Sequence, residues 1–197
     1  MDLFEAMGTA RSMRWLKPDP VPDELIEKLL WAGTRASNPN NTQAWDFVVV
    51  RDPEVRKALA SAIAPGASYV RALPDPGGAS GRRTLRGALN LIENFADFPA
   101  IIFVCGQNIF PPEAPAETMM YSAIYSAAQN ILLASRALGL GCAYTAMHHH
   151  NESEIRKILE LPDDRHIGVT MPIGFPENEF GPVKRRPLDE VVHQDRW

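Results

Sequence analysis

The stretch Ala100-Ile101-Ile102-Phe103-Val104-Cys105 is an unbroken run of apolar residues near the middle of the chain. A strand with one face in water alternates apolar and polar side chains, so a continuous apolar run is typical of a strand that is covered on both faces. Around it, the sequence predicts further strands over residues 47–50, 142–145 and 166–173. It predicts helices that open at Pro22-Asp23-Glu24 and that run over residues 54–64, 117–138 and 152–161. This alternation indicates one α+β domain with a central sheet flanked by helices.

The helix expected over residues 117–138 is the longest in the chain, and it is unusually apolar. Its main apolar face is widened on both sides until little polar surface remains, so we expect the helix to lie inside the protein or in an oligomer interface. The residues of the widened face are Met120, Ile124, Ala127, Ala128, Ile131, Leu132, Leu133 and Leu138.

The bulk properties are those of a single globular domain. The chain has 197 residues, which is enough for one well-cored domain, and a net charge of −4, which argues against a general attraction to nucleic acid. No apolar run approaches the roughly 20 residues of a membrane span, and the N-terminus lacks the apolar core of a signal peptide. Cys105 and Cys142 each lie in an apolar segment, which predicts buried free thiols in a cytoplasmic protein.

Two basic clusters lie at opposite ends of the sequence. Arg11-Ser12-Met13-Arg14 stands near the N-terminus, and Lys184-Arg185-Arg186 follows the apolar stretch Met171-Pro172-Ile173-Gly174. Guanidinium groups offer planar pairs of donors that match phosphate oxygens. The two clusters together therefore suggest one anionic ligand held by both ends of the chain, although the N-terminal cluster alone is more typical of a solvated surface.

A polar loop from Arg35 to Ala44 contains Asn38-Pro39-Asn40-Asn41-Thr42-Gln43. Asn tolerates left-handed backbone conformations, so simple turn chemistry explains this composition. The amides also pair a donor with an acceptor, as the edge of a pyrimidine-like ring requires. Composition alone slightly favours the turn.

Other candidate motifs give little support to other chemistries. His148-His149-His150 with Glu152 invites a metal hypothesis, but three consecutive side chains converge on one ion only with an unusual backbone, so we expect no metal site. Gly139-Leu140-Gly141 follows a helix instead of a strand and is interpreted as a helix C-cap. Neither a phosphate-binding Walker loop nor a nucleophile elbow is present.

The segment at about 69–86 is rich in proline and glycine and has few large apolar side chains, which predicts a mobile, lid-like loop. A C-terminal arm is expected at about 184–197. With these features, residues 1–197 are interpreted as a single domain.

Taken in order, five motifs resemble the FMN-dependent nitroreductase family. The resemblance covers nearly the whole chain except residues 51–95. The motifs are Arg11-Ser12-Met13-Arg14 with Pro20-Val21-Pro22, the loop Ser37 to Trp45, Gln129-Asn130 with Ala137 to Gly141, Pro172 to Pro176, and Arg185 to Leu188. In two places the chain departs from the family pattern: Ser37-Asn38 stands where Pro-Ser is common, and Ala44 replaces the usual proline.

The resemblance implies a nitroreductase-like fold with a mixed central β-sheet, assembled as an intertwined homodimer with FMN at the subunit interface. Arg11, Ser12, Arg185 and Arg186 would lie near the phosphate, and Arg14 would face the ribityl chain and the N1–C2 edge. Asn38, Asn41 and Gln43 would come from the other subunit. The backbone of Thr145, Ala146 and Met147 would pass the opposite side of the ring.

The activity implied is reduction of small, electron-poor acceptors such as nitroaromatics and quinones by NADH or NADPH in a ping-pong hydride transfer. The flavin N5 carries the hydride, so no side chain is expected to act as a catalyst. Alternatives on the same scaffold are an enoate reductase, a flavin reductase, a dehalogenase, or a non-catalytic protein that sequesters FMN.

Overall fold

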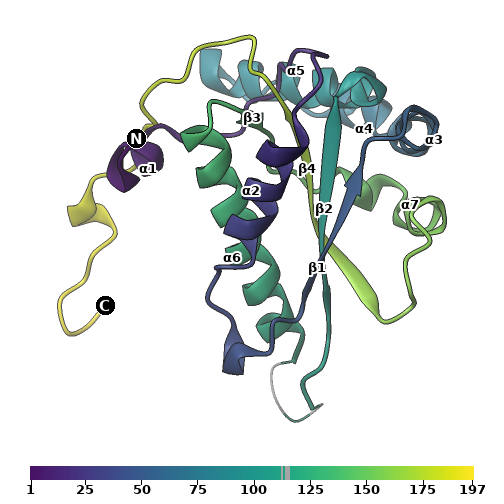
Figure 1. The fold of residues 1–197 in the computed structure, drawn as a ribbon. Helices are drawn as coiled ribbons and strands as arrows, with labels where there is room; N and C mark the ends of the chain where they lie inside the picture. The colour runs from purple at the N-terminus through teal and green to yellow at the C-terminus, as the bar shows by residue number, and fades with distance from the viewer. Residues whose placement is uncertain (112, 114–115) are drawn as a thin grey trace.

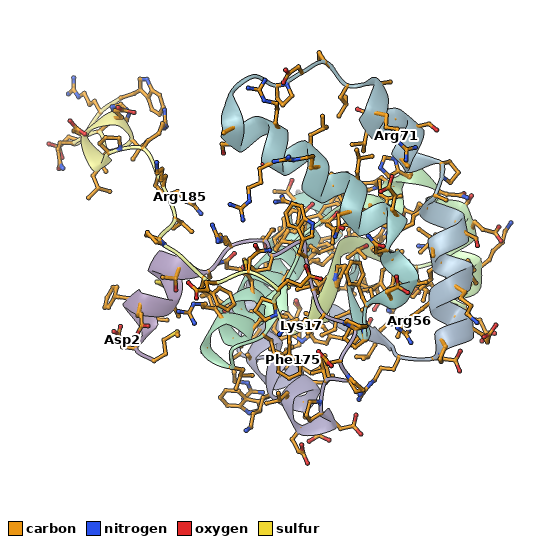
Figure 2. All side chains as sticks on the ribbon, turned by 90° about the horizontal axis from the view of Figure 1, so that it is seen from above. Asp2, Lys17, Arg56, Arg71, Phe175 and Arg185 are labelled. Atoms are coloured by element: carbon orange, nitrogen blue, oxygen red, sulfur yellow. The ribbon has the colours of Figure 1, made fainter. Side chains whose placement is uncertain are left out.

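The computed structural model describes residues 1–111, 113 and 116–197. Figure 1 shows a central sheet with helices on both faces, and Figure 2 shows the C-terminal turn projecting away from the body of the domain. The strands are β1 (Trp45–Val50), β2 (Ala100–Gln107), β3 (Gly141–Cys142) and β4 (Arg165–Gly174). The helices are α1 (Leu3–Thr9), α2 (Asp23–Gly33), α3 (Pro53–Ile63), α4 (Gly66–Ala72), α5 (Gly78–Glu93), α6 (Ala116–Ala137) and α7 (Glu152–Ile158), with short 3-10 turns at η1 (Pro39–Asn41), η2 (Phe95–Asp97), η3 (Met147–His150) and η4 (Leu188–Glu190).

The four strands form one sheet in the order β1-β2-β4-β3. Every pairing between the described strands is antiparallel, so the expected mixture of strand directions is wrong for this part of the chain. The reason lies in the connections. The last residue of β1, Val50, pairs with Ile101 near the start of β2, because α3, α4 and α5 return the chain to the edge where β1 ended.

Strand β2 is covered on both faces, as its sequence predicts. Ile101, Phe103 and Cys105 belong to a core shared with α3, α4, α5 and α7. The alternate residues Ala100, Ile102 and Val104 belong to a second core shared with α2 and α6. The predicted α+β arrangement of a central sheet flanked by helices is therefore confirmed (Figure 1).

Helix α6 packs closely on the sheet through Ile124. A Cβ added at Gly106 would lie 2.7 Å from Ile124 Cδ1, and one added at Gly168 would also clash with Ile124, so both strands need glycine where the helix crosses. The inner face of α6 is buried, as expected. Its outer face leaves Tyr125 47% exposed, stacked on Tyr121 at 5.5 Å between ring centroids.

The expected loop at 69–86 is mostly helical, and this prediction is corrected. α4 continues to Ala72, and α5 begins at Gly78, so only residues 73–77 connect the two helices. Proline is confined to this connection, and Gly77 and Gly78 have positive φ at its end. Residues 82–86 continue α5 as an amphipathic helix, with Leu85 packed against the core and the arginines exposed.

The structure also tests the predictions for the strand over 142–145 and for the two cysteines. The strand expected over 142–145 is shorter than predicted: β3 ends at Cys142, and Thr145 forms only an isolated bridge with Thr170. Cys105 and Cys142 are buried free thiols, as predicted, and burial raises the pKa of each to about 12. None of the helices in the described parts of the chain has the length and hydropathy that a bilayer crossing requires.

Candidate functional site

A cavity of about 760 Å³ lies between the N-terminal segment, the first turns of α5, the outer side of α6 and residues 182–185. Among the described residues that line it there is no carboxylate. The cationic residues of the lining are Arg11, Arg14, Arg83, Lys184 and Arg185. Such a concentration of one charge in a concave site favours an anionic ligand.

The N-terminal segment is fixed to the sheet by backbone hydrogen bonds. Met13 N donates to Cys142 O at 2.8 Å, and Lys17 N donates to Phe175 O at 2.8 Å, so Lys17 and Phe175 lie side by side in Figure 2. Ser12 Oγ accepts from Tyr144 N at 3.1 Å. These bonds hold the residues between Met13 and Lys17 at the edge of the sheet.

Helix α5 positions Arg14. Asn90 Nδ2 donates to Arg14 O at 2.7 Å, and a Cβ added at Gly87 would lie 2.5 Å from Arg14 Cδ. The glycine therefore lets the Arg14 side chain lie directly on the helix. Burial lowers the pKa of Arg14, which means that its guanidinium has lost part of its hydration and gains from a nearby anion.

The two ends of the chain meet at the cavity. Val183 N donates to Gly8 O at 2.9 Å, and Arg11 Nη2 donates to Glu179 O at 3.1 Å. Arg185 lies on the segment that leads away to the C-terminal turn (Figure 2). Of the predicted phosphate contacts, Arg11, Ser12 and Arg185 line the cavity together with Arg14, whereas Arg186 is exposed and is not part of the lining.

The Asn-rich loop lies elsewhere. Asn38 Oδ1 accepts from Gln43 N at 2.7 Å and Asn38 Nδ2 donates to Ala36 O at 3.3 Å, while Asn40, Asn41 and Gln43 have φ near +50°. Asn38 therefore has the turn role that composition favoured. Asn38, Asn41 and Gln43 are not in the cavity lining, and η1 lies at the other end of α6 from α1 (Figure 1). Within one chain they do not meet the cationic residues.

The segment of Thr145, Ala146 and Met147 follows β3, and Tyr144 before it is bonded to the N-terminal segment at Ser12. Thr145 exchanges backbone hydrogen bonds with Thr170 at 2.8 and 3.1 Å, and Met147 N donates to Thr145 Oγ1 at 3.2 Å. None of the three residues is in the cavity lining. The bond between Ser12 Oγ and Tyr144 N is what brings this segment next to the cavity.

Two of the three consecutive histidines approach Glu152. The 3-10 turn η3 brings ligand atoms of His148, His149 and Glu152 within 4.8 Å of one another, whereas His150 packs against Tyr69. His148 is fully buried, its Nδ1 lies 3.0 Å from Thr170 Oγ1, and burial together with the neighbouring His149 lowers its pKa to about 4. The expected absence of a metal site remains a prediction.

Several cavity residues were not among the predicted site residues. Lys184 and Gln129 stand within quoted motifs, so their positions in the sequence were a usable signal. The α5 residues were missed because that segment was interpreted as a loop. The missed residues with polar or large aromatic side chains are Trp15, Ser80, Arg83, Thr84, Gln129, Asn178 and Lys184.

The model of the Nitroreductase family matches residues 8–175, and the chain therefore belongs to this family. A putative NADH dehydrogenase/NAD(P)H nitroreductase from Archaeoglobus fulgidus is 28% identical over 201 residues, which cover 100% of this chain and 99% of the relative. An NADH dehydrogenase from Thermus thermophilus is 29% identical, with 98% and 95% covered.

Solved structures share the fold. Oxidised iodotyrosine deiodinase bound to FMN and 3-iodo-L-tyrosine superposes with a TM-score of 0.81 at 17% identity, over 100% of both chains. A BluB-like flavoprotein from Clostridium difficile superposes with a TM-score of 0.76 at 21% identity, also over 100% of both chains. The family and fold class predicted from the sequence are confirmed, and an oxidoreductase of the nitroreductase type is the predicted enzyme class that these comparisons support.

Proposed function

We propose that this chain is an FMN-dependent oxidoreductase that takes electrons from NADH or NADPH and passes them to small, electron-poor acceptors. The observation that carries the proposal is the cavity where cationic side chains from both ends of the chain meet and to which no described residue adds a carboxylate. The relatives named as NAD(P)H nitroreductases and the FMN in the deiodinase structure support the same assignment.

The residues of the cavity fit FMN. Its volume lies within the range of about 300–1,000 Å³ that small-molecule pockets occupy. Arg11, Lys184 and Arg185 provide charge for a phosphate, and the Ser12 hydroxyl lies beside them. Trp15, Met13 and Leu132 add apolar surface, as an aromatic ring system requires.

When bound, FMN would supply the two-electron chemistry, and the chain would supply binding, orientation and charge. Arg14 would hold a fixed positive charge near the N1–C2 edge of the ring. Such a preorganised cation stabilises the negative charge that develops there on reduction more than it stabilises the neutral oxidised ring. No side chain needs to act as a nucleophile.

We further propose that the complete site forms in a homodimer. Asn38, Asn41 and Gln43 lie at the other end of α6 from the cationic residues of their own chain (Figure 1). They reach the same ligand only if a second copy brings its loop to this cavity. The loop's fixed turn, held by Asn38, would then present the amides of Asn41 and Gln43 to the flavin ring.

A flavin titration tests the proposal. The protein should bind about one FMN per subunit, and anaerobic NADH or NADPH should bleach the flavin absorbance, which a nitroaromatic or quinone acceptor should restore. Failure of FMN to bind, followed by fluorescence quenching, would refute the cofactor assignment. Binding without bleaching by either nicotinamide would favour a protein that sequesters FMN.

A further inference from the structure

One face of α5 forms a wall of the cavity. Asn90 and Gly87 contact Arg14, and Arg83 lies one helical turn before Gly87, so these three residues share a face. Ser80 and Thr84 line the cavity beside Arg83. The cations of the two chain ends belong to the same lining, and Arg14 lies directly on this wall.

Arg83 differs from Arg82 and Arg71 in its partners, and its place in the cavity lining separates it from Arg86, for which no ion pair is found among the described residues either. Arg82 pairs with Asp75 at 2.8 Å, and Arg71 of α4 pairs with Glu93, so both are neutralised outside the cavity. For Arg83 no hydrogen bond or ion pair is found among the residues that the structure describes, and no described carboxylate lines the cavity. Its positive charge is therefore available to a ligand.

The cofactor accounts for the other cations. In the proposed function, Arg11, Lys184 and Arg185 balance the phosphate, and Arg14 faces the ring edge that becomes negative. Neither the phosphate charge nor the charge on the reduced ring requires Arg83 as a partner. We propose that Arg83, assisted by the Thr84 hydroxyl, is a specificity-determining residue that binds the carboxylate of an aromatic acid acceptor; this inference rests on the proposed function.

The chemistry of the wall suits this ligand. A guanidinium group donates two parallel hydrogen bonds to a carboxylate, and a neighbouring hydroxyl adds a third donor. The carboxylate also fixes the direction of the acceptor, which keeps its reducible group toward the interior of the cavity. Because Arg83 is exposed, salt should weaken the effect.

The test compares Arg83→Gln with Arg86→Gln. Arg86 is exposed on the same helix, one turn after Arg82, and is not part of the cavity lining, so its loss removes the same charge from the outer face. The acceptors are 4-nitrobenzoate and the neutral 4-nitrobenzyl alcohol. Arg83→Gln should lower kcat/KM for the benzoate about tenfold, mainly through KM, and leave the alcohol unchanged. Arg86→Gln should change neither.

The phosphate group of NADPH is the other anion that Arg83 could bind. Measuring flavin reduction separately from acceptor reduction distinguishes this phosphate from an acceptor carboxylate. Flavin bleaching by NADPH and by NADH should keep the same ratio in Arg83→Gln. A slower flavin reduction by NADPH alone would overturn the acceptor assignment. An equal fall of kcat/KM for the two nitro compounds, or no fall for either, would overturn it too.

A binding measurement separates this inference from the proposed function. Calorimetric titration with benzoate should give a Kd about tenfold weaker in Arg83→Gln than in Arg86→Gln or the wild type. If the wild-type protein fails to oxidise NAD(P)H, the proposed function fails, and this titration still decides whether Arg83 binds a carboxylate. Equal Kd values in all three proteins would refute the inference.

Discussion

At the scale of single residues, the cations of the cavity have separable tasks. Arg11→Ala and Arg185→Ala should each weaken FMN binding by about 1.5–3 kcal/mol, the range for hydrogen bonds to charged groups. Arg186→Ala is the matched control, because Arg186 is exposed and outside the cavity lining. Fluorescence titration measures all three affinities. A loss in Arg186→Ala as large as in Arg185→Ala would contradict this position of the phosphate.

His148 should make the fold sensitive to acid. It is fully buried and its pKa is lowered to about 4 from the ordinary 6.5, so below about pH 6.5 the unfolded chain binds a proton that the folded chain excludes. The free energy of unfolding should therefore fall as the pH drops from about 7 to 4, by up to about 3 kcal/mol from this residue.

Denaturant titrations at several pH values measure this effect. In His148→Gln, the free energy of unfolding should depend less steeply on pH between about 7 and 4. The ring of His149 is exposed, so His149→Gln should keep most of the pH dependence. The same slope in His148→Gln as in the wild type would mean that other groups cause the acid sensitivity.

At the scale of elements, sequence reasoning succeeded where one periodicity dominated. β2 is apolar at every position from Ala100 to Cys105, and α6 has a wide apolar face, so each could be assigned without its neighbours. α5 could not be assigned from its local sequence in this way. Its first turns are exposed, and Pro74, Pro76 and the glycines near its start dominate the local composition.

Part of the site could be predicted because some of its residues form clear clusters in the sequence. The basic clusters at Arg11 and Arg185 stand out in the sequence, and the fold brings them together. Arg83 had no local signal, because only the helical geometry of α5 shows which of its arginines faces inward. Composition favoured a turn around Asn38, but the particular bonds to Ala36 and Gln43 needed the structure.

The contact of α5 with Arg14 gives a prediction for this element. Gly87→Ala adds a methyl group at 2.5 Å from Arg14 Cδ, so the arginine side chain must move, while alanine favours the helix itself. We expect little loss of thermal stability but a lower midpoint potential of bound FMN, because the cation leaves its place near the reduced ring. Spectroelectrochemistry measures the potential.

Ala88→Gly is the control for changed helix propensity, since Ala88 packs into the core beside this contact. It should lower stability by roughly 1 kcal/mol and leave the potential unchanged. An unchanged potential in Gly87→Ala would show that α5 does not position Arg14 for the flavin.

At the scale of the whole molecule, the surface carries unpaired apolar residues at the chain ends. Phe4 of α1 is 82% exposed, Leu188 is 76% exposed and Trp197 is fully exposed on the C-terminal segment. Figure 2 shows the C-terminal turn projecting away from α1 and from the body of the domain. Large apolar side chains exposed in this way favour contact with another protein surface, in agreement with the proposed homodimer.

Complementation between two defective chains tests the shared site. Arg11→Ala should damage the cationic half of the site and Gln43→Ala the half contributed by the partner, so each variant alone should bind FMN weakly at both sites of its dimer. In a mixed dimer, one site carries both substitutions and the other carries neither. Random co-assembly of equal amounts should therefore restore tight binding at about a quarter of all sites. The control pairs Arg11→Ala with Arg185→Ala, which damage the same half and should restore nothing. If the first pair also restores nothing while light scattering shows a dimer, then Gln43 does not reach the partner's cavity.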